Sequence, residues 1–358
     1  TTMIMNMNGI ETTSVKNTNL WKNARLLNSG LFGEYSLQLK KLKFVASARL
    51  DYNVASSRDT LRLLKNEQVY FDETRSDYVN FSANAGISKQ IGQNITLSIF
   101  AGRGMRSPDL TERFIKYLVV GYDNYDYLGN PKLLPEKNYQ TDVILNVNTI
   151  KAGKLTLSGY YSMVQDFISG VILPASVTTP KTMGAPGVKQ FMNTGNAWFT
   201  GFEATYLTPE YKGFNADIAA SFTYGIHEKT IRNYFENGQV IGTQQIRDDA
   251  MQEIAPFEVR TVLNYTFYHR KMQASFSSRF VAAQRHVSLS YYESATPGFV
   301  LINLAYDYKF NKTVHMAAGI QNLLNKPYYE HLNRRIVGTT DKLPEPGRNF
   351  YLNLIIVI

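Results

Sequence analysis

The sequence ends in Asn349-Phe-Tyr-Leu-Asn-Leu-Ile-Ile-Val-Ile358, and this stretch decides the fold. Every second residue from Phe350 to Ile358 is apolar. An extended strand places alternate side chains on opposite faces, so these residues form one continuous apolar stripe. Such a stripe is either buried in a large sheet or exposed to lipid, and the same alternation recurs upstream.

The upstream segments come in pairs, and each pair is joined by a short turn. Longer intervals, such as 53–77 and 104–137, separate the pairs. This alternation of short turns and long loops is typical of outer-membrane barrels. A sheet exposed to lipid must also close on itself, because its backbone groups find no other hydrogen-bond partners there. We therefore predict an all-β fold, a transmembrane antiparallel up-and-down β-barrel, with about fourteen strands of about ten residues. The predicted strands cover 31–39, 44–52, 79–88, 95–99, 139–147, 155–161, 198–208, 214–224, 259–267, 272–280, 300–310, 314–320 and 349–358.

The composition excludes several other classes of protein. The 358 residues include no cysteine, so disulfides and thiolate metal sites are excluded. No run of 18 apolar residues occurs, which excludes helical membrane spans. The net charge of +9 is spread along the chain, and its densest cluster, Lys40, Lys41 and Lys43, fits a solvated turn better than a nucleic-acid site.

The chain begins with three methionines, Met3, Met5 and Met7, that share one face of an expected strand. Soft thioether ligands select Cu(I), so these residues are a weak candidate metal site. The alternative is that they are flexible apolar fillers. No other metal site is predicted.

No catalytic pattern supports an enzyme. The five histidines do not have the spacing of zinc ligands, and no G-x-S-x-G motif is present. We therefore expect neither enzymatic activity nor a bound cofactor.

Two longer motifs are distinctive enough to compare with known protein families. The first reads GRGMRSPDLTERF from Gly102, followed by LGNPKLLPEKNY from Leu128. The second reads GIQNLLNKPYYEH from Gly319, followed by PEPGRNF from Pro344. In this order, on a pattern of barrel strands, they resemble the TonB-dependent outer-membrane receptors over nearly the whole chain. The motif residues expected to set loop geometry are Pro108, Asp109, Glu112, Gly129, Asn130, Pro131, Pro135, Glu136, Asn322, Asn325, Pro346, Gly347 and Arg348.

The resemblance implies a 22-stranded barrel closed by an N-terminal plug that contacts TonB. About fourteen strands are part of such a barrel, so residues 1–358 are expected to be the C-terminal portion of a receptor barrel, with the plug absent. The final Ile358 replaces the aromatic residue with which the family usually ends.

Arginines and tyrosines in the motif loops combine cations with stacking faces, which suits an anionic, aromatic iron chelate. The alternative is that these tyrosines form an aromatic girdle or pack the loop on itself. The candidate substrate-binding residues are Arg103, Arg106, Arg113, Tyr122, Tyr125, Tyr127, Tyr328 and Tyr329, with Tyr117 and the pair Glu330-His331 beside them. No histidine lies between Pro108 and Asn130, which argues against the haem receptors of the family.

The expected function is therefore active uptake of a scarce nutrient, first of all an iron–siderophore or another metal chelate, across the outer membrane of a Gram-negative bacterium. The expected partners are TonB through the plug, the chelate, and outer-membrane lipid and lipopolysaccharide, and no nucleic acid. The alternatives are a copper, cobalamin or oligosaccharide receptor of the same family, a passive porin-like or adhesive barrel, and a soluble two-sheet binding protein.

Overall fold

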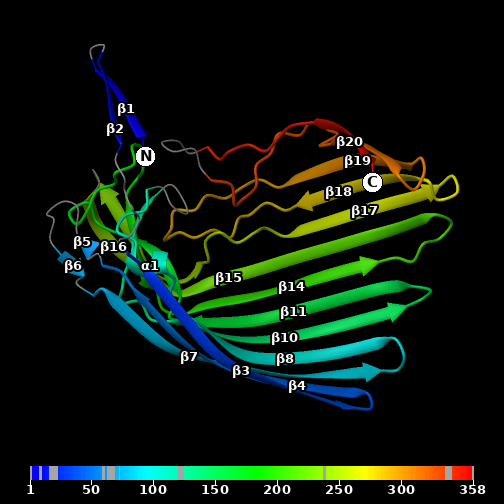
Figure 1. The fold of residues 1–358 in the computed structure, drawn as a ribbon, viewed down its shortest axis with the longest axis horizontal. Coiled ribbons are helices and arrows are strands. Elements are labelled where there is room, and N and C mark those ends of the chain that lie inside the picture. The colour runs from blue at the N-terminus through cyan, green and yellow to red at the C-terminus, as the bar shows by residue number, and fades with distance from the viewer. Residues whose placement is uncertain are drawn as a thin grey trace.

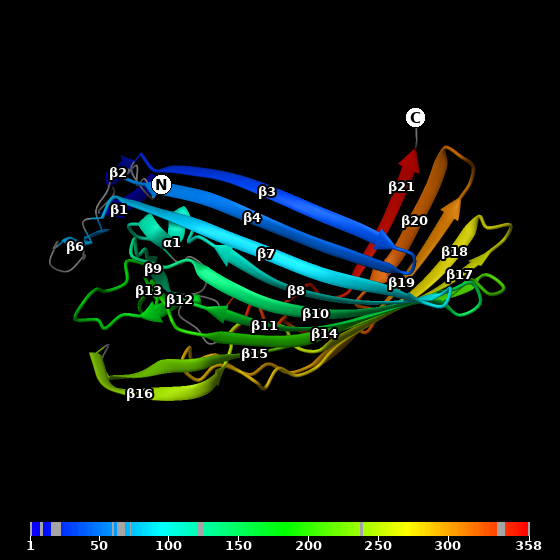
Figure 2. The same ribbon diagram turned by 90° about the horizontal axis from the view of Figure 1, so that it is seen from below.

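A fourteen-stranded antiparallel sheet dominates the molecule and curves strongly along its width (Figures 1 and 2). The computed structural model describes residues 2–7, 10–15, 23–58, 61–62, 69–71, 73–119, 125–236, 239–334 and 341–356. The all-β, up-and-down prediction is confirmed, because sequential strands pair antiparallel from one edge to the other. In spatial order the strands are β3 (Arg25–Leu39), β4 (Leu42–Ser56), β7 (Arg75–Ile91), β8 (Ile95–Arg106), β10 (Glu136–Thr149), β11 (Gly153–Gln165), β14 (Ala197–Leu207), β15 (Phe214–Glu236), β17 (Glu258–Phe267), β18 (Met272–Val281), β19 (Phe299–Lys309), β20 (Val314–Gln321) and β21 (Asn349–Ile356), with β16 (Gln239–Ala250) on the far part of β15.

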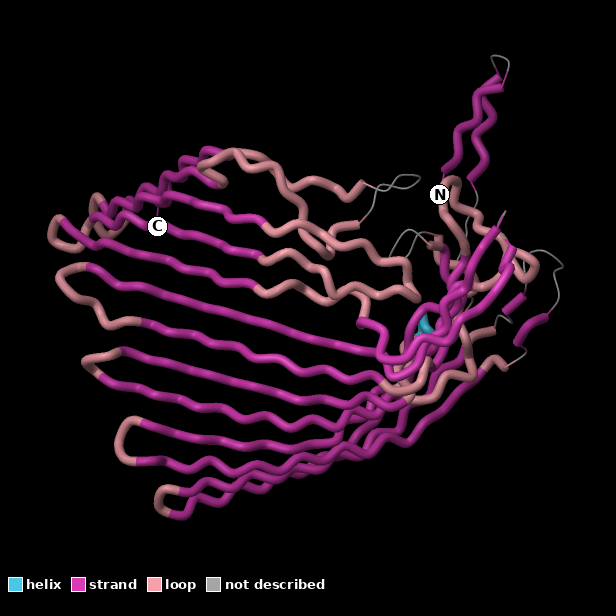
Figure 3. Tube along the Cα trace, turned by 180° about the vertical axis from the view of Figure 1, so that it is seen from behind, coloured by secondary structure: helices cyan, strands magenta, loops and turns pink. Residues whose placement is uncertain are grey.

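The connections differ at the two ends of the sheet, as predicted. Short turns join the strands at one end, and the long connections gather at the other (Figure 3). In the turn after β7, Gly92 has a φ of +70°, a conformation that glycine adopts without strain. We call the two ends the turn end and the loop end.

The two faces of the sheet differ in chemistry. On the outward face the apolar side chains of adjacent strands are exposed, for example Leu263, Phe276 and Leu304. The inward face carries polar side chains that bond to one another across strands. The Asn264 amide donates to Asn215 at 2.8 Å, and the Ser275 hydroxyl donates to Asn264 at 2.7 Å.

The last strand, β21, shows the same outward stripe. Phe350, Leu352, Leu354 and Ile356 are all more than half exposed, so no second layer of protein covers them among the described residues. This outcome agrees with the prediction that the stripe faces a non-aqueous surrounding rather than a core.

The predicted strand lengths were too short, and several elements were missed. β15 runs for 23 residues and forms a projecting ribbon with β16. The missed elements lie at the loop end, where the alternation is short or irregular. They are the helix α1 (Leu110–Phe114), the three-stranded sheet of β9 (Asp126–Leu128), β12 (Ile168–Ile172) and β13 (Val188–Asn193), the strand β2 (Ile10–Val15), and the hairpin of β5 (Leu61–Arg62) with β6 (Val69–Phe71). The strand expected at Met3, Met5 and Met7 is β1 (Thr2–Met7), which pairs with β2.

Conventional hydrophobic cores are found at the loop end. We call the largest the loop core; it consists of Ile115, Tyr127, Leu133, Ile168 and Phe191. It joins α1, β9, β12 and β13 into a compact unit. Among the described residues, no helix has the length and apolar character needed to cross a membrane.

Candidate functional site

The short helix α1 begins the first motif loop. Asp109 is its N-cap, and its carboxylate accepts a hydrogen bond from the Glu112 amide at 2.7 Å. The Glu112 carboxylate accepts in return from the Asp109 amide at 2.7 Å. This capping box holds the Glu112 carboxylate in place, with both of its oxygens within reach of Arg106 in the sheet.

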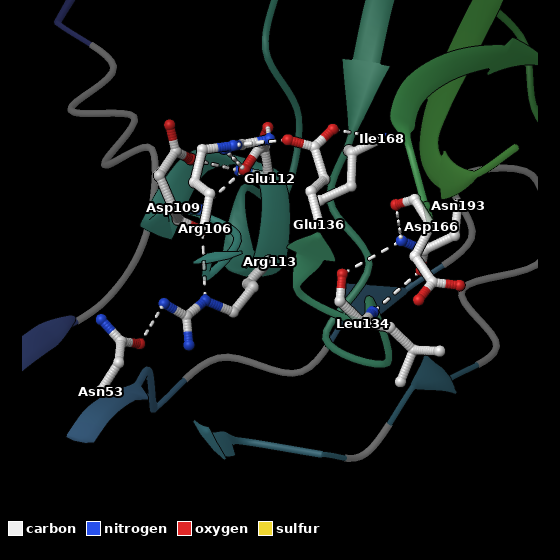
Figure 4. Close-up of polar contacts among 10 residues, drawn as sticks. All are labelled: Asn53, Arg106, Asp109, Glu112, Arg113, Leu134, Glu136, Asp166, Ile168 and Asn193. Atoms are coloured by element: carbon white, nitrogen blue, oxygen red, sulfur yellow. Dashed lines mark hydrogen bonds and ion pairs between the residues drawn. The ribbon is translucent and has the colours of Figure 1, made fainter. Parts of the chain in front are cut away.

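Arg106, the last residue of β8, lies between two carboxylates (Figure 4). Its Nε donates to Glu136 at 2.7 Å, and its Nη1 and Nη2 donate to the two oxygens of Glu112 at 2.8 and 3.0 Å. Glu136 also accepts from the Ile168 amide at 2.7 Å, which fixes the start of β12. Arg106 therefore ties the sheet to the loop core, while about half of its side chain remains exposed.

The Gly129–Pro135 turn packs under this helix. An added Cβ at Gly129 would lie 2.8 Å from the Ile115 amide nitrogen and 2.9 Å from the Arg113 carbonyl oxygen, so only glycine fits. Asn130 caps the turn by accepting from the Lys132 amide at 3.0 Å. Pro131 and Pro135 are buried, and their fixed φ angles suit this turn.

Arg113 does not reach a surface where a ligand could contact it. Its side chain is 1% exposed and donates to Asn53 at 2.7 Å and to Ser76 at 3.0 Å. Its guanidinium also lies 5.3 Å from the Tyr78 ring centre, and burial lowers its pKa. The structure thus gives Arg113 the role of attaching α1 to β4 and β7, rather than the predicted contact with substrate.

Arg103 points to the outward face, away from the sheet's interior. It lies opposite Tyr139 in the β8–β10 register and on the same face as Ile99. Its Nε donates to the Tyr139 hydroxyl at 3.2 Å. The sequence prediction treated Arg103 and Arg106 alike, but three positions along a strand place their side chains on opposite faces.

The predicted tyrosines pack the loop more than they line a cavity. Tyr127 is buried in the loop core against Phe191, with ring centres 5.1 Å apart. Tyr125 is half-buried, and the Lys189 ammonium lies 4.3 Å from its ring centre. Tyr122 lies outside the described residues.

Tyr117 belongs to a buried network around Asp126. Its hydroxyl donates to the Asp126 carboxylate at 2.6 Å and accepts from the Lys181 amide at 2.6 Å. Burial and the bond to Asp126 raise the pKa of Tyr117. The network holds the segment around 181 against β9.

The second motif also closes a loop. Asn322 accepts from the Lys326 amide at 2.8 Å, and Asn325 accepts from the Arg348 amide at 2.9 Å. Both asparagines have positive φ, which asparagine tolerates. A Cβ at Gly347, which follows Pro346, would lie 2.9 Å from the Asn325 side-chain oxygen. These contacts place Arg348 at the start of the last strand.

Tyr328 and Tyr329, both half-buried, follow in that loop. The Tyr328 ring lies 4.6 Å from the Phe299 ring. The neighbouring Glu330 forms an ion pair with Arg279, which also donates to Glu258 at 2.6 Å on the inward face. His331 is buried and bonds to Thr296 at 2.9 Å and to Glu293 at 3.1 Å.

Sequence reasoning missed Asp249, which holds the 282–298 connection to β16. Its carboxylate accepts from the Ser288 hydroxyl at 2.7 Å and from the amides of Leu289 and Ser290 at 2.9 and 3.1 Å. Burial alone would raise the pKa of Asp249, but these hydrogen bonds outweigh it and lower the pKa. No local spacing could have revealed the site, because the partners are distant in sequence.

His227 in β15 was missed as well, although its imidazole is fully buried. Its Nε2–H donates to the Gln252 side chain at 2.8 Å, and Gln252 donates to Ser169 at 2.9 Å. Nδ1 has no partner in the described part of the chain. Burial lowers the pKa of His227, so the imidazole is held neutral.

The side chains of Met3, Met5 and Met7, the predicted metal ligands, lie outside the part of the structure that is described. The backbone of Met3, Met5 and Met7 lies in β1, where Met5 is opposite Thr12. Elsewhere, the side chains that the structure describes contain no group of three or more histidines or carboxylates able to hold a metal ion.

Two bands of aromatic side chains border the outward apolar face. At the loop end, the register brings together Tyr139, Tyr161, Trp198 and Tyr224 on adjacent strands. At the turn end, Phe214 stacks on Tyr265 with ring centres 4.2 Å apart. The segment of β15 between the bands spans about ten residues, the length of a tilted membrane strand.

Comparisons with known proteins agree with this architecture. A family model described as "TonB dependent receptor-like, beta-barrel" matches residues 4–323. No curated protein matches the sequence.

Solved structures share the fold at low identity. "Copper transporter OprC" superposes with a TM-score of 0.76 at 22% identity, covering 99% of this chain and 51% of that chain. The hemophore receptor HasR of Serratia marcescens gives a TM-score of 0.68 at 16% identity, covering 97% and 53%. The FrpB iron transporter of Neisseria meningitidis (F3-3 variant) gives 0.64 at 15%, covering 94% and 45%. The chain thus spans about half the length of the structures that it matches.

The family match extends over most of the chain and agrees with the strand order, the connections and the two-faced sheet. The chain therefore belongs to the TonB-dependent receptor family and matches its β-barrel model.

Proposed function

We propose that the protein is an outer-membrane receptor that binds a scarce nutrient and imports it with energy from TonB. One observation supports this proposal above the others: a sheet with an exposed apolar outward face and a hydrogen-bonded polar inward face, in a family of transport receptors. The outward face suits contact with hydrocarbon, and the inward face suits passage of a hydrophilic solute. The contact with TonB is proposed for a plug of the kind that the family resemblance implies.

The proposed cargo is an iron–siderophore or another metal chelate. Structural neighbours include proteins named as iron transporters and a siderophore receptor, PirA of Pseudomonas aeruginosa. In this chain, Arg106, Tyr125, Tyr328 and Tyr329 keep part of their side chains accessible at the loop end. Tyrosine rings and a guanidinium are suited to stacking against an anionic aromatic chelate.

Uptake by cells tests this proposal. The gene is deleted in its host. It is then restored either as the full-length wild type or as a double variant that carries both Tyr328→Ala and Tyr329→Ala. We expect radiolabelled iron to enter from a catecholate siderophore only with the gene and with TonB, and the double variant to take up about tenfold less, as expected for the loss of about 1.4 kcal/mol of binding. Iron uptake that is identical with and without the gene would refute this cargo, and uptake that does not depend on TonB would favour a passive barrel.

Copper is a second candidate cargo. The three alternating methionines Met3, Met5 and Met7 offer thioether ligands of the kind that select Cu(I), and one of the similar structures is named as a copper transporter. The test is Cu(I) binding by the purified receptor and by its Met3→Leu, Met5→Leu, Met7→Leu variant. Equal binding by the two proteins would exclude these residues as the ligands.

A further inference from the structure

Arg103 is a cation on the outward face of the sheet. Residues 97, 99 and 103 of β8 share this face, and Ile99 is 44% exposed on it. The guanidinium is held at two points, since Nη1 donates to the Phe81 carbonyl at 2.6 Å and Nε donates to the Tyr139 hydroxyl at 3.2 Å. No carboxylate among the described residues pairs with Arg103.

The neighbours of Arg103 indicate its depth relative to the membrane. It lies directly opposite Tyr139, one of the four aromatic residues of the band at the loop end. Aromatic bands mark the level of lipid headgroups rather than that of the acyl chains. Arg103 is thus at the depth where a cation meets phosphate, and an arginine in the hydrocarbon would be costly.

Arg103 differs from Lys137, the neighbouring cation on this face, in having no carboxylate partner among the described residues. Lys137 projects on the same side two residues before Tyr139, but its ammonium is bound to Asp166 at 2.9 Å. Arg103 therefore keeps a net charge on the lipid side, with Nη2 free of any partner in the described structure. A guanidinium presents paired N–H donors that match phosphate oxygens, and the Tyr139 hydroxyl, which accepts from Arg103, still has its own proton to donate.

We propose that Arg103 and Tyr139 bind the phosphate of a lipopolysaccharide headgroup in the outer leaflet. This site rests on the membrane placement in the proposed function, but not on the identity of the cargo. It lies on the outside of the barrel, so it does not compete with transport. Its role is to hold a phosphorylated lipid against β8 and β10.

The experiment measures lipid binding to the full-length receptor purified in detergent, by native mass spectrometry. Lipid A is compared with the same lipid after removal of its phosphates, with excess inorganic phosphate as competitor. We expect Arg103→Gln to weaken lipid A binding at least fivefold and Lys137→Gln to change it less than twofold. Arg49→Gln is the matched control, because Arg49 is on the inward face and pairs with Asp51, and it should leave binding unchanged.

Heat-modifiable gel mobility of each variant shows separately whether the barrel is folded. If Arg103→Gln does not fold, Arg103→Lys is used instead. Lysine keeps the positive charge but lacks the paired N–H donors of the guanidinium, so this variant should still weaken binding. Equal binding of lipid A by wild type and a folded Arg103 variant would overturn the site, as would equal binding of the dephosphorylated lipid or full competition by free phosphate. A receptor that is soluble without detergent and shows no heat-modifiable mobility would instead refute the proposed membrane function.

Discussion

The fourteen-stranded sheet, which we call the wall, exposes its apolar side chains, whereas the loop core buries them. Along the wall, Leu263, Phe276 and Leu304 are exposed on the outward face, and the polar residues are inside. In the loop core, Ile115 and Leu133 are fully buried. The loop core follows the rule for proteins in water, and the wall follows the rule for proteins in lipid.

The two regions are also stabilised by different interactions. The wall depends on its continuous ladders of backbone hydrogen bonds, such as the register of β10 with β8 and β11, because lipid offers the backbone no other partner. The loop end depends on packing and on buried charged groups that receive several hydrogen bonds, such as Asp249 and Arg113. Substitutions should therefore have different consequences in the two regions.

A charge on the outward face should have the largest effect. We expect Phe276→Arg to destabilise the folded barrel by about 2–4 kcal/mol, since an arginine at the middle of the apolar belt faces hydrocarbon. The measurement is urea unfolding in lipid vesicles, followed by heat-modifiable mobility. Ser275→Arg, one position away on the inward face, is the control and should cost much less. Equal losses for the two variants would mean that the faces do not differ in their surroundings.

At the loop end, Asp249→Asn should open the 282–298 connection. The substitution replaces a carboxylate that accepts from two backbone amides by a group that is itself partly a donor, at a local cost of about 2–3 kcal/mol. Hydrogen exchange of residues 288–290 should become faster by roughly 30-fold or more. The neighbouring Asp248 is exposed, so Asp248→Asn should leave the exchange unchanged, and protection that survives in Asp249→Asn would show that other contacts hold the loop.

Gly129→Ala tests the packing of the loop core. The new Cβ would collide with backbone atoms of Ile115 and Arg113, and we expect a local loss of about 1–3 kcal/mol. Gly104 on β8 has no atom within 4 Å of an added Cβ, so Gly104→Ala is the matched control. Proteolysis of the folded barrel should cut the 107–135 segment faster in Gly129→Ala alone. Unchanged resistance would show that this turn has room to adjust.

The smallest effect should be a pH dependence at the loop end. The pKa of His227 is lowered in the folded state, so an opened state binds the proton more readily. Stability should be complete above about pH 6.5 and fall at lower pH by at most about 1.4 kcal/mol per unit. Hydrogen exchange of β16 at pH 7 and pH 5 measures this fall, which His227→Gln should remove and His269→Gln, in an exposed turn, should not. A fall that persists in His227→Gln would assign it to another group.

The sequence predicted the wall well because membrane strands repeat a simple rule. The alternation in 214–224 and 272–280 identifies both the strands and their lipid face, and the short turns set the pairing. Arg103 was grouped with Arg106 near the loop tyrosines, but the same alternation places Arg103 on the outward face of β8. At the loop end, the contacts of Asp249 and Arg113 join residues about forty to sixty positions apart, and no period in the sequence reports such pairs.

The central claim is that the apolar face contacts lipid and the polar face lines an aqueous interior. Because the sequence has no cysteine, single cysteines can be placed at successive positions 217–222 of β15 and spin-labelled in lipid vesicles. We predict a period of two, with labels at 218, 220 and 222 accessible to oxygen in the lipid and labels at 217, 219 and 221 accessible to a water-soluble nickel chelate. Equal accessibility at all six positions, or the reverse alternation, would contradict the account.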